Sequence, residues 1–248
     1  MIRQLSNKWK IVLSIIFLLM AVEIISAPIE WLWPKRLGGF THWSGNTSRK
    51  QIALTFDDGP SGYTEKILDI LLVNNIQATF FVVGRQAEYF PEFIKRMEME
   101  NHEIGNHTYS FAARKLIFFS DIQEAEIAIT QDIVKRLTSR RPRYYRSPGG
   151  LLGRRHWNFV RNQNLKVVYG TLPMPHPQQS AAEQLTVVIK NLKPGAIIIL
   201  HDGDDADPDS DRPASTVVLL PVLLNKLKER GYEVVPLHQL LEGDGASH

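Results

Sequence analysis

The chain has 248 residues, of which 44% are hydrophobic and 22% are charged. This composition is sufficient for the core of one domain and argues against a disordered chain. The absence of cysteine excludes disulfides, thiolate catalysis and cysteine-based zinc sites. The net charge of +3 comes with no basic stripe of interleaved aromatic residues, so we expect no nucleic-acid partner.

The N-terminal segment has the features of a targeting signal. Arg3, Lys8 and Lys10 precede an apolar run over residues 11–27, which is typical of a signal peptide or a signal anchor. Pro28 would hinder cleavage directly after the run, so residues 1–36 favour an uncleaved anchor. We therefore expect a single-pass protein of the cell membrane with the remainder of the chain outside the cytoplasm, or a secreted protein if the signal is cleaved.

The rest of the chain alternates between short apolar runs and longer amphipathic ones. Residues 37–49 are predicted to be a linker, residues 50–242 a single domain and residues 243–248 a tail. Helical periodicity occurs in residues 63–74, 90–100, 121–137, 154–163, 181–192 and 217–230. Strands are expected at residues 51–56, 78–83, 103–106, 143–146, 166–169, 196–200 and 233–236.

This order predicts the fold class. About seven β-then-α units in succession indicate an α/β protein with a parallel sheet and helical crossovers. A closed sheet of this kind is a TIM-like barrel, and an open one is a doubly wound sheet. The chain length fits both.

Polar side chains recur where the predicted strands end. In a β/α barrel these ends converge on one face, where active sites are built. Asp-Gly-Pro is also ordinary turn chemistry, so the aspartate pair alone would indicate only a turn. The shared position favours an active site made of Asp57, Asp58, His107, Arg146, His201 and Asp202.

The same residues lie in recognisable strings. The string Thr55-Phe56-Asp57-Asp58-Gly59-Pro60 resembles the first motif of the polysaccharide deacetylase, or NodB-homology, family of carbohydrate esterases. Three later strings resemble further motifs of that family: Gly105-Asn106-His107-Thr108, Arg146-Ser147-Pro148-Gly149-Gly150 and Ile198-Ile199-Leu200-His201-Asp202. The resemblance implies a distorted (β/α) barrel, commonly with seven strands, and metal-dependent N-deacetylation of N-acetylglucosamine-containing glycans.

The resemblance also implies roles for single residues. Asp57 resembles the general base, Arg146 the residue that orients it, and His201 the general acid. Asp58 and His107 resemble ligands of a divalent metal, expected to be zinc. The substrate-binding positions implied in this way are Pro148, Gly149, Ile199 and Leu200.

Two motifs depart from the family pattern. Phe111 stands where a second histidine ligand usually follows the first, which leaves zinc one protein ligand short of a usual catalytic site. A ligand from elsewhere, a weaker metal site and a loss of metal catalysis all remain open. After the fifth predicted strand, residues 169–177 lack the usual aspartate and tryptophan, and His176 is the one histidine there.

Several alternatives follow. Besides an N-deacetylase of N-acylated glycans, the chain fits a carbohydrate-binding pseudoenzyme, or a hydrolase of O-acetyl groups or small linear amides. Tyr145 and Trp157 are candidates either for stacking on sugar rings or for the core. The aspartates of residues 204–211 favour a solvated loop over a calcium site.

Overall fold

The computed structural model describes residues 40–45, 47–110, 120–150, 152, 154–171, 179–204 and 212–242. The predicted anchor (residues 1–36), the tail, Phe111, His176 and most of the acidic loop lie outside these residues. Within the described part of the chain, no helix is both long and apolar enough to cross a bilayer.

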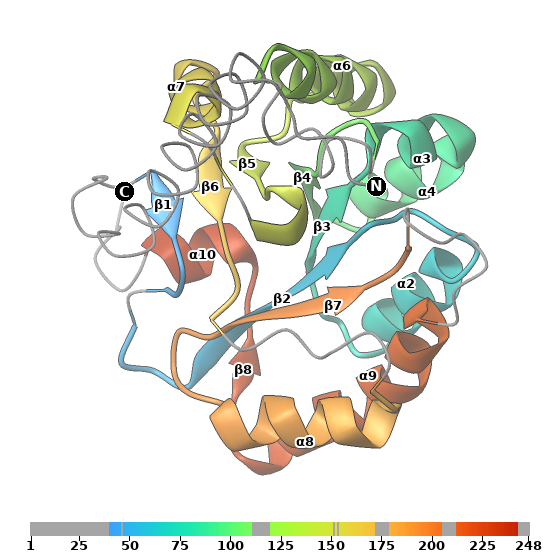
Figure 1. Ribbon diagram of the computed structural model, residues 1–248. Helices are drawn as coiled ribbons and strands as arrows, with labels where there is room; N and C mark the ends of the chain where they lie inside the picture. Colours follow the sequence, from blue (N-terminus) through green and yellow to red (C-terminus); the bar gives the residue numbers. More distant parts are fainter. Residues whose placement is uncertain are drawn as a thin grey trace, which may run out of the picture.

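The centre of the fold is a curled sheet surrounded by helices (Figure 1). Its hydrogen-bonded order is β1-β6-β5-β4-β3-β2-β7, with β8 pairing beside β2. Every strand pair found among the described residues is parallel. The strands are β1 (Thr41–His42), β2 (Gln51–Asp57), β3 (Thr79–Val82), β4 (Glu103–Asn106), β5 (Tyr144–Tyr145), β6 (Lys166–Val168), β7 (Ile197–His201) and β8 (Glu233–Val234).

Helices connect these strands, and most of them pack on the outside of the sheet (Figure 1). All six predicted helices are present: five agree within one residue at each end, and α9 begins five residues earlier than predicted. Two short helices, α3 and α10, were not predicted, because six residues are too few to give a clear helical period. The helices are α2 (Thr64–Val73), α3 (Gly84–Tyr89), α4 (Pro91–Met99), α6 (Ser120–Thr138), α7 (Arg154–Asn162), α8 (Ala181–Asn191), α9 (Arg212–Glu229) and α10 (Leu237–Glu242), with a short 3₁₀ turn, η2, at Pro148–Gly150.

The two ends of the strand order approach each other. The N–H of Gly45, just after β1, donates to the carbonyl oxygen of Gly195 before β7 at 2.8 Å. The N–H of Thr171, just after β6, donates to the Ile197 carbonyl oxygen at 3.0 Å. The sheet therefore curls into a distorted barrel, which confirms the predicted fold class and excludes the open doubly wound alternative.

Residues 37–49, which were expected to be a linker, contain a short strand. Thr41 and His42 form β1, which pairs with Val167 and Val168 of β6. Trp43 then stacks on Tyr169 with ring centroids 4.1 Å apart. The polar, glycine-rich composition of residues 37–49 concealed this strand, because two paired residues leave no alternating pattern in the sequence.

Side-chain alternation decides which residues of the central strands enter the barrel. On β2, Ile52, Leu54 and Phe56 pack in the core between the sheet and the helices. Successive side chains of a strand point to opposite faces, so Thr55 and Asp57 face the interior. On β7, Ile198 and Leu200 belong to the helix-side core, which leaves Ile199 and His201 on the inner face.

A second apolar cluster fills the inside of the barrel. Leu237 and Leu240 of α10 pack there against Ala53 and Phe81, which lie on the inner face of β2 and β3. Ile197 and Val168 belong to the same cluster. Polar side chains lie beyond this cluster, at the end of the barrel where β2, β4, β5 and β7 finish.

Candidate active site

The loop after β2 places two carboxylates on the same side of the sheet. Asp57 is the last residue of β2 and is 3% exposed. Asp58 adopts a positive φ of 70°, which breaks the alternation of the strand. Aspartate tolerates this left-handed conformation better than most residues. As a result, the Asp58 carboxylate reaches the ring of His107, which directly follows β4, with an Oδ1–Nε2 distance of 3.2 Å.

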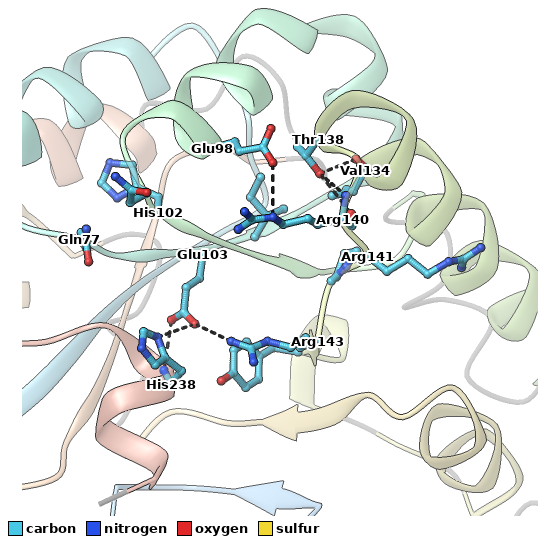
Figure 2. Close-up of a pocket in the computed structure, with 14 residues that line it drawn as sticks. Gln77, Glu98, His102, Glu103, Val134, Thr138, Arg140, Arg141, Arg143 and His238 are labelled. Carbon is cyan, nitrogen blue, oxygen red and sulfur yellow. Dashed lines mark hydrogen bonds and ion pairs between the residues drawn. The ribbon is translucent and has the colours of Figure 1, made fainter. Parts of the chain in front are cut away.

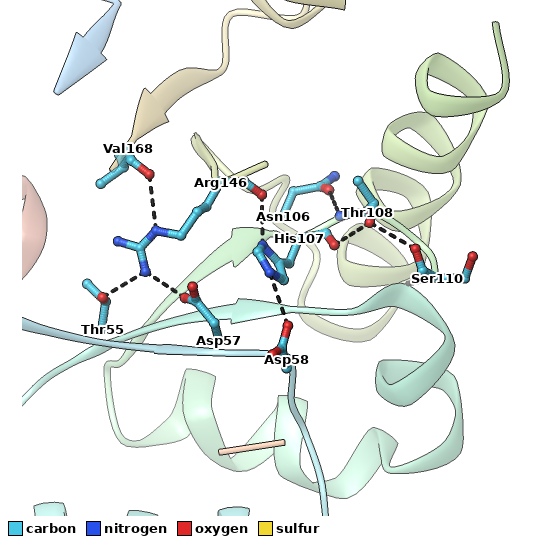
Figure 3. Close-up of polar contacts among 9 residues, drawn as sticks. All are labelled: Thr55, Asp57, Asp58, Asn106, His107, Thr108, Ser110, Arg146 and Val168. Atoms are coloured by element: carbon cyan, nitrogen blue, oxygen red, sulfur yellow. Dashed lines mark hydrogen bonds and ion pairs between the residues drawn. The ribbon is translucent and has the colours of Figure 1, made fainter. Parts of the chain in front are cut away.

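His107 is held from both sides of its ring (Figure 3). Its Nδ1 lies 2.7 Å from the carbonyl oxygen of Arg146. A carbonyl only accepts, so Nδ1 carries a proton and Nε2 faces Asp58. Burial alone would lower the pKa of His107, but the hydrogen bond to Asp58 and the charges of Asp57 and Asp58 outweigh it and raise the pKa.

Arg146 lies at the centre of the polar cluster and is 3% exposed. Its Nη1 donates to Asp57 Oδ1 at 2.6 Å and to the Thr55 hydroxyl at 2.8 Å, and its Nε donates to the Val168 carbonyl oxygen at 3.1 Å (Figure 3). Burial lowers the pKa of Arg146, although the charge of Asp57 opposes the shift. An arginine remains charged at neutral pH, so the pair is a buried ion pair.

The remaining guanidinium nitrogen of Arg146 has different surroundings. Nη2 is buried and finds no hydrogen-bond acceptor among the described residues. The guanidinium carbon lies 4.0 Å from the centroid of the Phe81 ring, a close cation–π contact. The Phe81 ring thus stacks on the guanidinium, while Nη2 is left without an acceptor in the described part of the chain.

His201 and Asp202 complete the inner end of β7. His201 is the parallel-strand partner of Asp57, so the expected base and acid lie at the same level of adjacent strands. Asp202 is 1% exposed and accepts a hydrogen bond from the Thr64 hydroxyl at 2.7 Å. Burial, and then the charges of Asp57 and Asp58, raise the pKa of Asp202 to about 7, although the bond from Thr64 opposes the shift.

The expected substrate-binding residues divide into two groups. Pro148 and Gly149 belong to the 3₁₀ turn that begins two residues after Arg146, and Gly149 has a positive φ of 70°. Ile199 lies on the inner face of β7, where its side chain abuts Gly170: a Cβ at Gly170 would be 2.5 Å from the Ile199 Cδ1. Leu200 instead packs in the helix-side core, so its prediction as a substrate contact is wrong. Alternation along the strand sends its side chain away from His201.

The described residues contain no group of three or more histidine, aspartate or glutamate side chains arranged to hold a metal. Asp58 and His107 therefore form a pair without a third protein ligand in that part of the chain. Two nearby hydroxyl groups that could bind a metal make hydrogen bonds to other residues. The Ser110 hydroxyl donates to Glu126 at 2.8 Å, and the Tyr109 hydroxyl donates to Glu88 at 3.2 Å. The pair still fits a divalent cation, because a carboxylate and an imidazole nitrogen are both suitable metal ligands. The Nδ1 hydrogen bond of His107 fixes the orientation of the ring, as is usual for a metal-binding histidine.

A polar groove lies at the opposite end of the strands, where β3, β4 and β5 begin (Figure 2). In it, Glu103 contacts His238 Nδ1 at 3.2 Å and forms an ion pair with Arg143 at 3.9 Å. None of the expected catalytic residues lines it. The candidate site lies instead at the end of the barrel that holds Asp57 and Arg146, which is the end where active sites are built in this architecture.

Sequence reasoning missed the partners that orient the site. Thr55 precedes Asp57 by two residues and so shares its face, a signal that period-two alternation could have provided. Phe81 reaches Arg146 only through strand pairing. Tyr145 and Trp157 are 0% and 9% exposed and belong to a core cluster under α6 and α7, so of their two predicted roles the core is the correct one.

Comparison with known proteins identifies the family of the chain. Residues 44–168 match the family model of polysaccharide deacetylases. A peptidoglycan-N-acetylglucosamine deacetylase of Bacillus cereus is 33% identical over 202 residues, which are 81% of this chain and 71% of the relative. A chitooligosaccharide deacetylase of a Bradyrhizobium species is 30% identical over 77% of this chain and 90% of its own length. The chain belongs to the polysaccharide deacetylase family, a family of hydrolases.

Solved structures show the same fold. The crystal structure of a peptidoglycan N-acetylglucosamine deacetylase superposes with a TM-score of 0.76 at 30% identity, covering 88% of this chain and 98% of the other. A mutant of a family 4 carbohydrate esterase pseudoenzyme, with restored activity, superposes with a TM-score of 0.70 at 26% identity, covering 82% of this chain and 72% of the other. The fold thus occurs both in enzymes and in a relative described as a pseudoenzyme.

Proposed function

We propose that this chain removes acetyl groups from the N-acetylglucosamine units of a polysaccharide or oligosaccharide, releasing acetate and a free amine. The observation that carries the proposal is the meeting of two pairs at one end of the barrel. Asp57 pairs with Arg146 at 2.6 Å, and Asp58 pairs with His107 at 3.2 Å. Names of the relatives, a peptidoglycan deacetylase and a chitooligosaccharide deacetylase, support the same class of substrate.

In this mechanism each residue has one task. Asp57, oriented by Arg146, takes a proton from the water that adds to the amide carbonyl carbon. His201 gives a proton to the nitrogen as the C–N bond breaks, so that the amine leaves neutral, and the acetic acid formed with it ionises to acetate in water. Asp58 and His107 would hold a divalent metal, zinc being our expectation, which supplies a Lewis acid for the carbonyl and for water when bound.

Acetate release tests the reaction. The purified chain with added zinc or cobalt should release acetate from chitooligosaccharides or peptidoglycan, and Asp57→Asn should abolish release. Asp132→Asn is a matched control, because Asp132 is exposed and paired to Arg141 far from the site. If a folded wild-type chain with metal releases no acetate from any N-acetylated glycan tested, the deacetylase proposal fails.

The pseudoenzyme alternative is supported by one feature, the phenylalanine at position 111. It predicts a chain that binds acetylated glycans but releases no acetate at any metal concentration. A deacetylase with two protein ligands predicts weak, exchangeable metal and activity that rises with added metal. Activity on O-acetylated sugars or small linear amides, assayed alongside, tests whether the same residues act on another acylated substrate.

We further propose that residues 1–36 anchor the domain on the outer side of the cell membrane. The basic residues before the apolar run support this orientation. The full chain should then sediment with membranes, and a version that begins at Leu37 should not. Recovery of both in the soluble fraction at equal levels would refute the anchor.

A further inference from the structure

Asp202 follows the expected acid His201, yet the mechanism above gives it no task. It is almost completely buried, at 1% exposure. Buried carboxyl groups are costly unless they make compensating hydrogen bonds. The contacts of Asp202 all lead to one segment, from Asp57 at the end of β2 to Thr64 at the start of α2, which also carries Asp58.

Four contacts join Asp202 to that segment. Its carboxyl oxygen Oδ2 accepts from the hydroxyl of Thr64, the first residue of α2, at 2.7 Å. Its backbone N–H donates to the Asp57 carbonyl oxygen at 3.2 Å. Its own carbonyl oxygen accepts from the Ser61 hydroxyl and, at 3.5 Å, from the Thr64 hydroxyl. The loop is therefore tied to the end of β7 from both its beginning and its end.

Two glycines show how closely the loop and β7 approach. A Cβ at Gly59 would overlap the Asp202 carboxylate, and a Cβ at Gly203 would overlap the Asp58 carbonyl oxygen. Backbone and carboxylate thus pack without space between them on either side of Asp58. These contacts hold the backbone of Asp58 and Gly59 against the end of β7.

We propose that Asp202 is a positioning residue that holds the Asp58 loop against the end of β7 and so sets Asp58 relative to His201. The inference rests on the proposed function for its catalytic consequence, since Asp58 is the expected metal ligand and His201 the expected acid. Misplacing such groups by about 1 Å can lower a rate about a hundredfold.

Three variants separate the contribution of the carboxyl group from that of its partner. Asp202→Ala removes the acceptor for Thr64 and leaves a gap beside Gly59. Asp202→Asn keeps the shape and one acceptor oxygen. Thr64→Val keeps the size of Thr64 and removes only the donor, so it serves as the second variant if Asp202→Ala does not fold.

One experiment on these variants combines amide hydrogen exchange of residues 58–64 with acetate release and competitive titration of zinc. In Asp202→Ala we expect faster exchange confined to residues 58–64, a kcat about tenfold to hundredfold lower and weaker zinc binding. Asp202→Asn should restore most of all three, and Thr64→Val should change them in the same direction by less.

The outcomes separate this inference from the proposed function. Wild-type exchange in residues 58–64 of folded Asp202→Ala, or its wild-type kcat, would overturn the positioning role while the deacetylase function stands. A wild-type chain that releases no acetate would refute the function, and hydrogen exchange would still decide whether Asp202 holds the loop. Equal loss of protection throughout the domain would also overturn the inference, since it would indicate a general structural role.

Discussion

Arg146 connects the two halves of the candidate site through different parts of one residue. Its side chain binds Asp57, and its backbone carbonyl accepts the Nδ1–H of His107. The first contact depends on the guanidinium, which also donates to the Thr55 hydroxyl and stacks on the Phe81 ring. The second does not depend on the side chain. Base orientation and ligand orientation are therefore separable by substitution at this position.

Arg146→Lys should separate them. A lysine ammonium cannot reproduce the fork of donors or the stacking on Phe81, so we expect kcat to fall about a hundredfold. Zinc affinity should change less than about threefold, because the carbonyl that orients His107 remains. Kinetics and competitive metal titration measure the two effects, with Arg141→Lys as the exposed control. An equally large loss of zinc affinity would contradict the prediction.

Gly105 provides a test of the packing behind Arg146. A Cβ at this position would be 2.5 Å from the Phe81 ring, which itself packs on the guanidinium. Gly105→Ala should therefore cost about 1–3 kcal/mol of unfolding free energy, the usual range for overpacking, and should also lower kcat. Gly62→Ala is the control, because no atom lies within 4 Å of its added Cβ. Urea denaturation showing equal stability for both variants would refute this account.

At the scale of elements, β1 is a short edge strand that completes the barrel. The N–H of Val167 donates to the Phe40 carbonyl oxygen at 2.6 Å, and the N–H of Tyr169 donates to the His42 carbonyl oxygen at 2.8 Å. Without this segment the edge of β6 would be open, and open edges pair with other chains. The segment is therefore part of the folded domain, although it lies before the expected boundary at residue 50.

Comparing a version of the chain that begins at Leu37 with one that begins at Lys50 tests the role of β1. The shorter version should unfold at lower urea concentration and should associate at high protein concentration, because the β6 edge is exposed. Denaturation curves and light scattering measure both effects. Identical curves for the two versions would support the original interpretation of residues 37–49 as a linker.

At the scale of the whole molecule, stability should decrease as the pH is lowered, because His156 takes up a proton on unfolding. This ring is 2% exposed, and burial lowers its pKa to about 4 from an ordinary value of 6.5. A lowered folded pKa means that the unfolded chain binds the proton more readily below pH 6.5. The stability linked to this group is present above pH 6.5 and is lost as the pH falls towards 4.

From pH 7 to pH 5 the loss from this group should be about 2 kcal/mol, because each pKa unit corresponds to about 1.4 kcal/mol. His156→Gln removes the titration and keeps a polar partner for the Tyr145 hydroxyl, which lies 3.2 Å from the histidine Nε2. Urea denaturation at both pH values should therefore show a smaller pH effect in the variant than in the wild type. The same pH effect in both proteins would exclude His156 as its source.

Most of the fold was predictable from the sequence because its information is local. Seven of the strands and six of the helices follow from apolar periodicity, and the catalytic candidates follow from polar residues at strand ends. The elements that escaped prediction, β1, α3 and α10, contain two to six residues each. Their existence depends on contacts with distant parts of the chain, such as the pairing of Thr41 with Val167.

The sequence by itself determined the family, the α/β class and the residues available for chemistry at one end of the barrel. The tertiary structure decided how they are used: Asp58 turns towards His107, Arg146 joins both pairs, and Leu200 faces the helices. The reason is physical. Periodicity acts over a few residues, whereas the contact between Asp57 and Arg146 joins positions 89 residues apart, and only strand register and the curl of the sheet bring them together.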